Sequence, residues 1–466
     1  MPITKNRQII PAMVRRHIED AAFFWSQYDN SEESHLLHLS ELTRFTNFIG
    51  AHLDGVKIAG REAWPLALAA LERWKKPGEA FVSTYSAACS GEPSDLDLIA
   101  GQLRACPEEL IRGAISALAW APWQAAERAI TRWTAPGSEP VVVVTALRAL
   151  TLINNSIVSD PSSSDSDTWL QAPLHVYLTS SDAHVRAAAC RLAPLADDDE
   201  DLRSSLKDAL QDSDLAVRAQ AAIALAQLEQ NMSEFEPDEK RRSERLIRLC
   251  ENTLRQCIYS QVSLLASTTG WHAKQGNRRL NRWLTHLAGI IKPGHDHLPD
   301  ILSSLPTRFA LRFAAYHGDP ANLPFVVKQM DNPETARYAG WVWQVITGID
   351  IAEAGLILEE PASSPDSMLQ GAPLDSDFDL SFPNGSAIAC YPLSLQCGRR
   401  YLNGQPITLA ATLDIIEGSS QPVRSIAVQH LQSLDSLFFL SIRAPASIQS
   451  RSTDEIREII HLESME

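Results

Sequence analysis

The chain has 466 residues, 45% of them hydrophobic, and a formal net charge of −16. This length fits about three ordinary domains or one long array, and the apolar content is enough for a folded core. The negative charge argues against a protein that holds nucleic acid or anionic lipid over its whole surface. No segment reaches the roughly 18 to 20 apolar residues of a membrane span, and no apolar run of a signal peptide follows residues 1–7. We therefore expect a soluble, cytoplasmic protein without a membrane partner.

The first 90 residues are predicted to form an N-terminal helical region. Val14, Ile18, Ala21, Ala22 and Trp25 lie on one apolar stripe at helical spacing, and a similar pattern continues through 39–55. A Leu/Ala-rich helix is expected between 65 and 74, because two lysines followed by Pro and Gly are typical of a helix end. Short helices separated by Pro and Gly continue to 153, and a polar Ser/Asp-rich loop follows at 154–168.

A short phrase then occurs twice. Residues 182–189 and 214–221, which begin 32 residues apart, both read D-x-x-V-R-A-x-A. A period in the thirties is typical of stacked helical repeats, in which each hairpin is too small to bury its own apolar face. Such arrays usually bind other macromolecules along an extended surface.

Each position of the phrase has a structural interpretation. The Asp suits a helix N-cap, the Val would point inward, and the Arg could reach a carboxylate or carbonyl of the adjacent repeat. The structural repeat residues are Asp182, Val185, Arg186, Asp214, Val217, Arg218 and, in a weaker third copy, Val423 and Arg424.

The phrase resembles HEAT repeats. We therefore predict an all-α fold, an α-solenoid of HEAT-like helical hairpins with a further helical part at the C-terminal end. The expected regions are 1–90, N-terminal helices; 91–350, the repeat solenoid; 351–396, an irregular Pro/Ser/Asp-rich linker or insertion; and 397–466, C-terminal helical repeats.

Positive charge is concentrated in one part of the chain. Between 240 and 312 there are 13 Lys and Arg against 4 Asp and Glu, a net charge of +9, so the remainder carries −25. The candidate partner-binding residues are Arg241, Arg242, Arg245, Arg248, Lys274, Arg278, Arg279 and Arg282. One interpretation is a solvated face that neutralises acidic repeats nearby, and the other is a docking patch for an acidic partner. A basic groove for nucleic acid is a further alternative, against which the overall charge argues.

The sequence contains few candidates for chemistry. It has no nucleophile elbow, P-loop or dinucleotide fingerprint. The pairs His35/His38 and His295/His297 have no Cys or carboxylate at a recognised ligand spacing. His52 lies near Asp54, but we interpret that segment as packing and capping. The tryptophans Trp271, Trp283, Trp341 and Trp343 are expected in the core. We therefore expect no enzyme activity, no catalytic residues, no metal and no cofactor.

The seven cysteines form no C-x-x-C pair. Cys250 and Cys257, like Cys390 and Cys397, are seven residues apart, which in a helix places each pair on one face. We expect buried, reduced thiols at these positions.

Further phrases resemble an uncharacterised proteobacterial family of HEAT-containing proteins. They are A-H-L-D-G-V-K-I-A-G at 51–60, E-A-F at 79–81, I-T-G-I-D at 346–350, R-Y-L-N-G at 400–404, and R-A-P-A at 443–446 with Gln449 and Arg451. The segments around 154–168 and 359–395 do not resemble it. Genes of this family tend to lie beside those of bacterial type VI secretion, with spike proteins, effectors and accessory factors. The resemblance therefore implies a partner among secretion components or toxins.

These observations lead to one main functional hypothesis, a non-enzymatic protein-binding scaffold that acts as an adaptor or chaperone for a type VI effector or spike component. An immunity protein that neutralises a cognate toxin is a close alternative, because complementary charge would speed their encounter. A nucleic-acid-binding HEAT-like protein is an alternative of a different class, and an enzyme of unknown type is a third.

Overall fold

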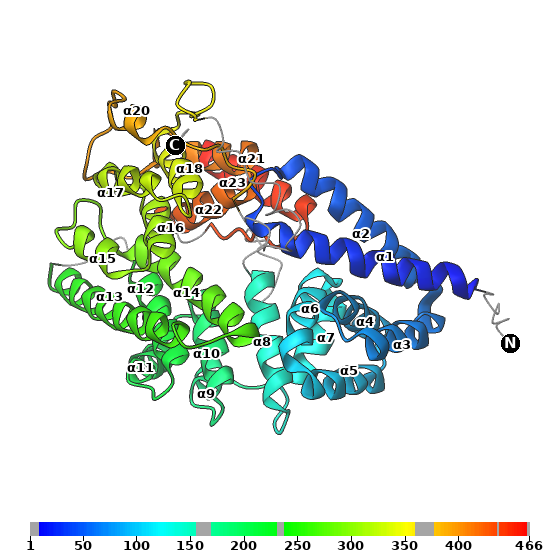
Figure 1. Cartoon of the computed structure of the whole chain (residues 1–466). Coiled ribbons are helices and arrows are strands. Elements are labelled where there is room, and N and C mark those ends of the chain that lie inside the picture. Colours follow the sequence, from blue (N-terminus) through cyan, green and yellow to red (C-terminus); the bar gives the residue numbers. More distant parts are fainter. Residues whose placement is uncertain (1–8, 155–168, 231–236, 359–376, 436–437, 464–466) are drawn as a thin grey trace, which may run out of the picture. The chain divides into compact units, whose positions relative to one another are not determined.

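The computed structural model describes residues 9–154, 169–230, 237–358, 377–435 and 438–463 (Figure 1). Helices make up most of this described chain, which confirms the all-α class. Contacts divide the chain into two compact units: unit 1 is Met1–Ala224 with Phe438–Glu466, and unit 2 is Leu225–Leu437. The boundaries expected at 90, 350 and 396 stay a prediction. Among the described helices, none is long and apolar enough to cross a membrane.

Unit 1 contains most of the helical hairpins. Its helices are α1 (Pro11–Asn30), α2 (Leu39–Ala59), α3 (Trp64–Trp74), α4 (Pro77–Ser90), α5 (Pro93–Ala105), α6 (Pro107–Trp120), α7 (Trp123–Trp133), α8 (Pro140–Asn154), α9 (Leu174–Leu178), α10 (Ala183–Leu192), α11 (Glu200–Ala209) and α23 (Ala446–Glu463), while α12 (Leu215–Gln230) runs across the boundary between the units. Several of these helices begin with proline, whose fixed φ suits the first turn and whose missing N–H would be unpaired there anyway.

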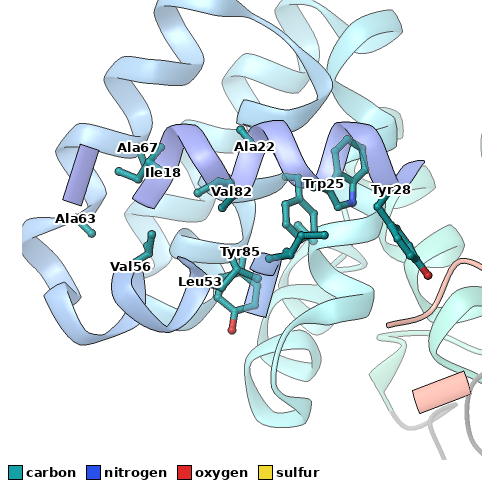
Figure 2. Packing of buried hydrophobic residues seen from close by; sticks show 14 of the residues in the cluster. Ile18, Ala22, Trp25, Tyr28, Leu53, Val56, Ala63, Ala67, Val82 and Tyr85 are labelled. Atoms are coloured by element: carbon teal, nitrogen blue, oxygen red, sulfur yellow. The ribbon is translucent and has the colours of Figure 1, made fainter. Parts of the chain in front are cut away.

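The apolar stripe predicted for the first helix lies in the core of unit 1. Figure 2 shows Ile18, Ala22, Trp25 and Tyr28 following one another along α1. The Trp25 ring stacks on that of Phe81 in α4, with centroids 5.0 Å apart. Stacked aromatic pairs of this kind add about 0.5–1.5 kcal/mol beyond the area that they bury. The sequence periodicity therefore identified a real packing face.

Close backbone contact between α4 and α6 depends on a glycine. A Cβ placed on Gly113 of α6 would lie within 3 Å of the backbone of α4, at Pro77 O and Phe81 N. A larger residue would push the helices apart. Gly113 thus allows the close packing of α6 on α4.

The end of the chain returns to unit 1. The Tyr28 hydroxyl donates to the carbonyl of Ala444 at 2.6 Å, and the Gln449 amide donates to the same carbonyl at 2.7 Å. The Trp120 indole N–H donates to Arg443 O at 3.3 Å. The R-A-P-A phrase with Gln449 therefore attaches the C-terminal segment to α1 and α6.

Unit 2 combines helices with irregular segments. Its elements are α13 (Pro237–Leu265), α14 (Gly270–Ile290), α15 (Leu298–Ser304), α16 (Thr307–His317), α17 (Leu323–Lys328), α18 (Ala336–Thr347), α20 (Gly385–Ala389), β1 (Tyr401–Leu402), β2 (Gln405–Pro406), α21 (Leu409–Gly418) and α22 (Gln421–Leu434). The two strands pair antiparallel, Tyr401 with Pro406 and Leu402 with Gln405. This hairpin departs from the purely helical C-terminal part that the sequence predicts.

Two of the family-like phrases meet in unit 2. The N–H groups of Asn403 and Gly404 donate to the carbonyls of Val345 and Ile346, at 2.6 and 3.2 Å. Gly348 has a φ of +72°, and a Cβ there would lie 2.4 Å from Asn403 O. The I-T-G and R-Y-L-N-G phrases are therefore two sides of one joint, in which only glycine fits at position 348.

The irregular region expected at 351–396 lies partly outside the described residues, since 359–376 are not described. Its described part is packed. Asp377 is buried and accepts hydrogen bonds from Arg308 Nη1 and Nη2 at 2.7 and 2.6 Å. The polar loop predicted at 154–168 also falls outside the described residues, except for Asn154, the last residue of α8.

The expectation of buried thiols is wrong for Cys390 and Cys397, which are exposed. Both lie after α20 in an irregular stretch that precedes β1, so their seven-residue spacing does not place them on a helix face. Cys250 and Cys257 in α13 are buried as expected. Burial raises the pKa of the Cys250 thiol to about 12, so this thiol stays protonated at neutral pH.

Candidate partner-binding surface

The residues of the repeat phrase connect neighbouring hairpins. The Asp182 carboxylate caps α10 by accepting from the backbone N–H groups of His184 and Val185 at 2.8 and 3.0 Å. Asp214 caps α12 in the same way, through Ala216 and Val217. Caps of this type stabilise a protein by about 1 kcal/mol relative to alanine.

The two arginines of the phrase meet at Asp212. Arg186 reaches across to the next repeat, where its Nε and Nη2 donate to the two Asp212 carboxylate oxygens at 2.7 and 2.9 Å. Arg218 donates to the backbone carbonyl of Asp212 at 2.6 Å. The hydrogen bond from Arg186 lowers the pKa of Asp212. This two-point contact links the repeats, so these arginines are occupied by the fold.

The third copy has the same function in a more buried setting. Arg424 is fully buried, and its Nε donates to Ile416 O at 2.7 Å while its Nη1 donates to the Gln421 side chain. These bonds connect α22 to the end of α21. At the position of the capping Asp this copy has Ser420, whose side chain makes no capping hydrogen bond. The weaker sequence match therefore reflects the loss of the cap, whereas the arginine keeps its role.

The basic residues expected to bind a partner lie on the α13–α14 hairpin of unit 2, whose two helices pack against each other. The exposed ones are Arg241, Arg242, Arg245, Arg248, Lys274, Arg278 and Arg279. Arg282 is only half-buried, and thus less accessible than the rest. We call these eight residues the basic hairpin.

Two arginines of the basic hairpin form long ion pairs. Arg241 lies 3.6 Å from Asp238, and Arg248 lies 3.8 Å from Glu244. In the described part of the chain, no carboxylate comes within ion-pair distance of Arg242, Arg245 or Arg279. Exposed pairs of this kind contribute about 0–1 kcal/mol, so a partner could displace them at little cost.

Three exposed apolar side chains of the same hairpin were not identified from the sequence. They are Leu249, Leu264 and Trp271. Trp271 was expected in the core, which is wrong: it is 37% exposed at the start of α14, beside His272. The sequence feature that could have indicated this is the preceding Gly270, which has a φ of +62° and is the first residue of α14, so that Trp271 lies at an exposed helix start. Trp283, Trp341 and Trp343 are buried as expected.

His52 pairs with a second histidine rather than with Asp54. His52 lies 3.0 Å from the His17 ring, between their Nδ1 atoms, and its carboxylate neighbour is Asp20 at 3.9 Å rather than Asp54. Burial lowers the pKa of His52, so it is mainly neutral at pH 7. Among the described residues, no group of three or more His, Cys, Asp or Glu side chains is placed to hold a metal ion.

A buried polar centre in unit 2 was also missed. Arg400 donates to the carbonyls of Ala288, Gly289 and Ile291 at the end of α14. Burial and this arginine lower the pKa of both His317 and His430 to about 3. Nothing in the local sequence pairs these positions, because their contacts span about a hundred residues. The centre is enclosed and explains how unit 2 is held together.

Comparison with protein families supports the repeat architecture. A model of HEAT repeats matches residues 170–251, a segment that runs from just before α9 into α13 and contains both clear copies of the phrase. A search of curated proteins finds no match. Since HEAT hairpins stack into surfaces that bind other proteins, the match and the helical fold indicate a scaffold for protein–protein interaction.

Proposed function

We propose that the chain is a non-enzymatic scaffold that binds its protein partner through the basic hairpin, α13–α14. The carrying observation is the exposure of seven of these cations, of which Arg242, Arg245 and Arg279 have no carboxylate at ion-pair distance among the described residues. A chain of net charge −16 would otherwise repel an acidic partner, so a local positive surface supplies the attraction that speeds a correct encounter. The exposed Leu249, Leu264 and Trp271 add apolar area of the kind found in interface cores.

We further propose that this partner is an effector or spike component of type VI secretion, for which the chain acts as an adaptor or chaperone in the cytoplasm. The support is the resemblance of phrases at 51–60, 346–350, 400–404 and 443–446 to a family whose genes lie beside secretion genes. The joint between the second and third of these phrases and the attachment of the fourth to α1 and α6 have structural functions. In the immunity alternative, the acidic surface of the chain, rather than the basic hairpin, would cover a basic toxin.

The test is co-purification of the tagged full chain with the individually expressed products of adjacent genes. The informative variant reverses three hairpin charges: Arg242→Glu, Arg245→Glu and Arg279→Glu. Its matched control, Arg15→Glu, Arg44→Glu and Lys76→Glu, changes net charge equally at exposed positions of unit 1. We expect retention of an effector or spike component by the wild type and the control, and at least a hundredfold weaker binding by the hairpin variant.

Other outcomes would replace the proposal. Equal binding by both variants would contradict docking through the hairpin. Tight one-to-one inhibition of a toxin, insensitive to the hairpin variant, would favour immunity. Binding of DNA or RNA that weakens steeply with salt and is lost in the hairpin variant would favour the nucleic-acid alternative.

A further inference from the structure

Unit 1 carries a second set of arginines, on three helices that are neighbours in space. Arg112 lies on α6, Arg148 on α8 and Arg191 on α10, and α8 packs against both α6 and α10. On each helix the arginine is partly accessible; Leu147 and Ala149 beside Arg148, and Cys190 and Leu192 beside Arg191, are buried. Around Arg148 and Arg191, α8 and α10 therefore expose only a narrow stripe of surface, and in each case that stripe carries a guanidinium.

A fourth arginine joins them from the returning C-terminal segment. Arg443 Nη2 lies 3.2 Å from Asp29 Oδ1 and 3.2 Å from Ser116 Oγ. The other oxygen of Asp29 accepts from Arg112 Nε at 2.5 Å, and Arg112 also reaches Glu32 at 3.4 Å. The Asp29 carboxylate thus bridges two of the four guanidinium groups, which shows how this cluster holds an acidic group.

Arg148 differs from Arg112 and Arg443. Within the described residues, no carboxylate lies at ion-pair distance from Arg148 and no hydrogen bond engages its guanidinium. The charged groups that act on it are instead Arg191, Arg443 and Arg112. Burial, followed by these three cations, lowers its pKa well below the ordinary value. A guanidinium held among like charges is unfavourable in the unbound protein, and an incoming anion would relieve this repulsion.

We propose that Arg148, with the neighbouring arginines of α6, α10 and the C-terminal segment, is a recognition site for a carboxylate of an acidic segment in the protein partner. The planar guanidinium fork matches a carboxylate in two-point geometry, and the bridging Asp29 provides an example of this binding. Arg148 is only partly accessible, on a narrow stripe of the helix surface. A single extended side chain can reach this position, whereas a nucleic-acid duplex cannot.

This inference rests on the proposed function only in that the partner is a protein. The site lies in unit 1, whereas the basic hairpin lies in unit 2, so each can fail alone. The experiment must therefore report on Arg148 separately from the exposed hairpin arginines. Phenylglyoxal, which modifies arginine side chains, provides such a readout when labelling is located peptide by peptide with mass spectrometry.

The experiment labels the full chain at low salt with and without a hexaglutamate peptide, and with inorganic phosphate at the same concentration. We expect the peptide to suppress labelling of Arg148 and phosphate to have little effect. The Arg148→Met variant should bind the peptide at least tenfold more weakly, and Arg148→Lys, which keeps the charge but lacks the fork, should lie between. The hairpin variant should retain peptide protection of Arg148, and circular dichroism checks that all variants are folded.

Several results would overturn the inference. One is unchanged labelling of Arg148 while hairpin arginines become protected. Another is wild-type peptide affinity in the Arg148→Met variant. Equal protection by phosphate would show a general anion site. Increased Arg148 labelling without peptide, after replacement of Asp160, Asp165 and Asp167 by Asn, would show that carboxylates of the chain itself occupy the site.

Discussion

Arg400 in unit 2 and Arg148 in unit 1 are both only partly accessible to solvent, and burial lowers the pKa of both. Their surroundings are opposite. Arg400 donates to three carbonyls at the end of α14 and has Asp319 nearby, whereas the charged neighbours of Arg148 are arginines. Residue type and burial alone therefore do not distinguish an arginine that stabilises the fold from one that binds a ligand. The number of guanidinium donors with hydrogen-bond acceptors does distinguish them, so we assign Arg400 to the fold and Arg148 to ligand binding.

The largest change in stability is expected when the hydrogen bonds of Arg400 are removed. Arg400→Met removes the donors of three carbonyls and leaves Asp319 without its nearby cation, and we expect unit 2 to lose about 3–5 kcal/mol of unfolding free energy. Arg399→Met is the matched control, because Arg399 is the exposed neighbour and should change stability by less than about 0.5 kcal/mol. Urea denaturation measures both. A loss below about 1 kcal/mol for Arg400→Met would show that Arg400 is not a structural centre.

The same centre predicts a pH dependence. His317 and His430 have pKa values of about 3 in the folded chain against an ordinary 6.5, so the unfolded chain binds more protons between these values. The contribution of these two neutral histidines to the free energy of unfolding is therefore fully present above about pH 6.5. It falls as the pH decreases towards 3, by about 1.4 kcal/mol per pH unit for each histidine. Urea denaturation at a series of pH values measures the loss. NMR titration provides the check: either imidazole protonating near pH 6 would contradict this account.

An intermediate effect is expected at the repeat joint. Arg186→Met leaves Asp212 without its two-point partner in a half-buried setting, and we expect a loss of about 1–3 kcal/mol. Arg132 makes a similar two-point contact with Asp97, but both side chains are largely exposed. Arg132→Met should therefore cost no more than about 1 kcal/mol. If thermal unfolding ranked the two variants equally, the repeat phrase would not link the hairpins as described.

Local patterns predicted local structure well. The D-x-x-V-R-A-x-A phrase identified the caps at Asp182 and Asp214 and an arginine that reaches the next repeat, because all of these contacts lie within one repeat period. Contacts between distant segments were inaccessible to the same reasoning. Asp29 meets Arg443 across 414 residues, and Arg400 meets α14 across more than a hundred. No local periodicity encodes such pairs.

The same limit applies to the candidate surfaces. Charge counting located the basic hairpin, because its cations are close in the sequence and exposed on one helical hairpin. It could not locate the cluster of Arg148 with Arg112, Arg191 and Arg443, since these four residues come from three helices and the C-terminal segment and each looks ordinary in its own context. Helical spacing also misplaced Trp271, because an aromatic residue at the start of a helix has the same spacing whether it is buried or exposed.

The most direct test of the central claim is the unfolding free energy of Arg148→Met, measured in urea without any ligand. The account predicts a value equal to the wild type or higher by up to about 1 kcal/mol, because the substitution removes an unsatisfied cation from among other cations and keeps the apolar stem. Residues held for binding rather than folding behave in this way. A loss of more than about 1 kcal/mol would mean that Arg148 supports the fold, and the distinction drawn between it and Arg400 would be wrong.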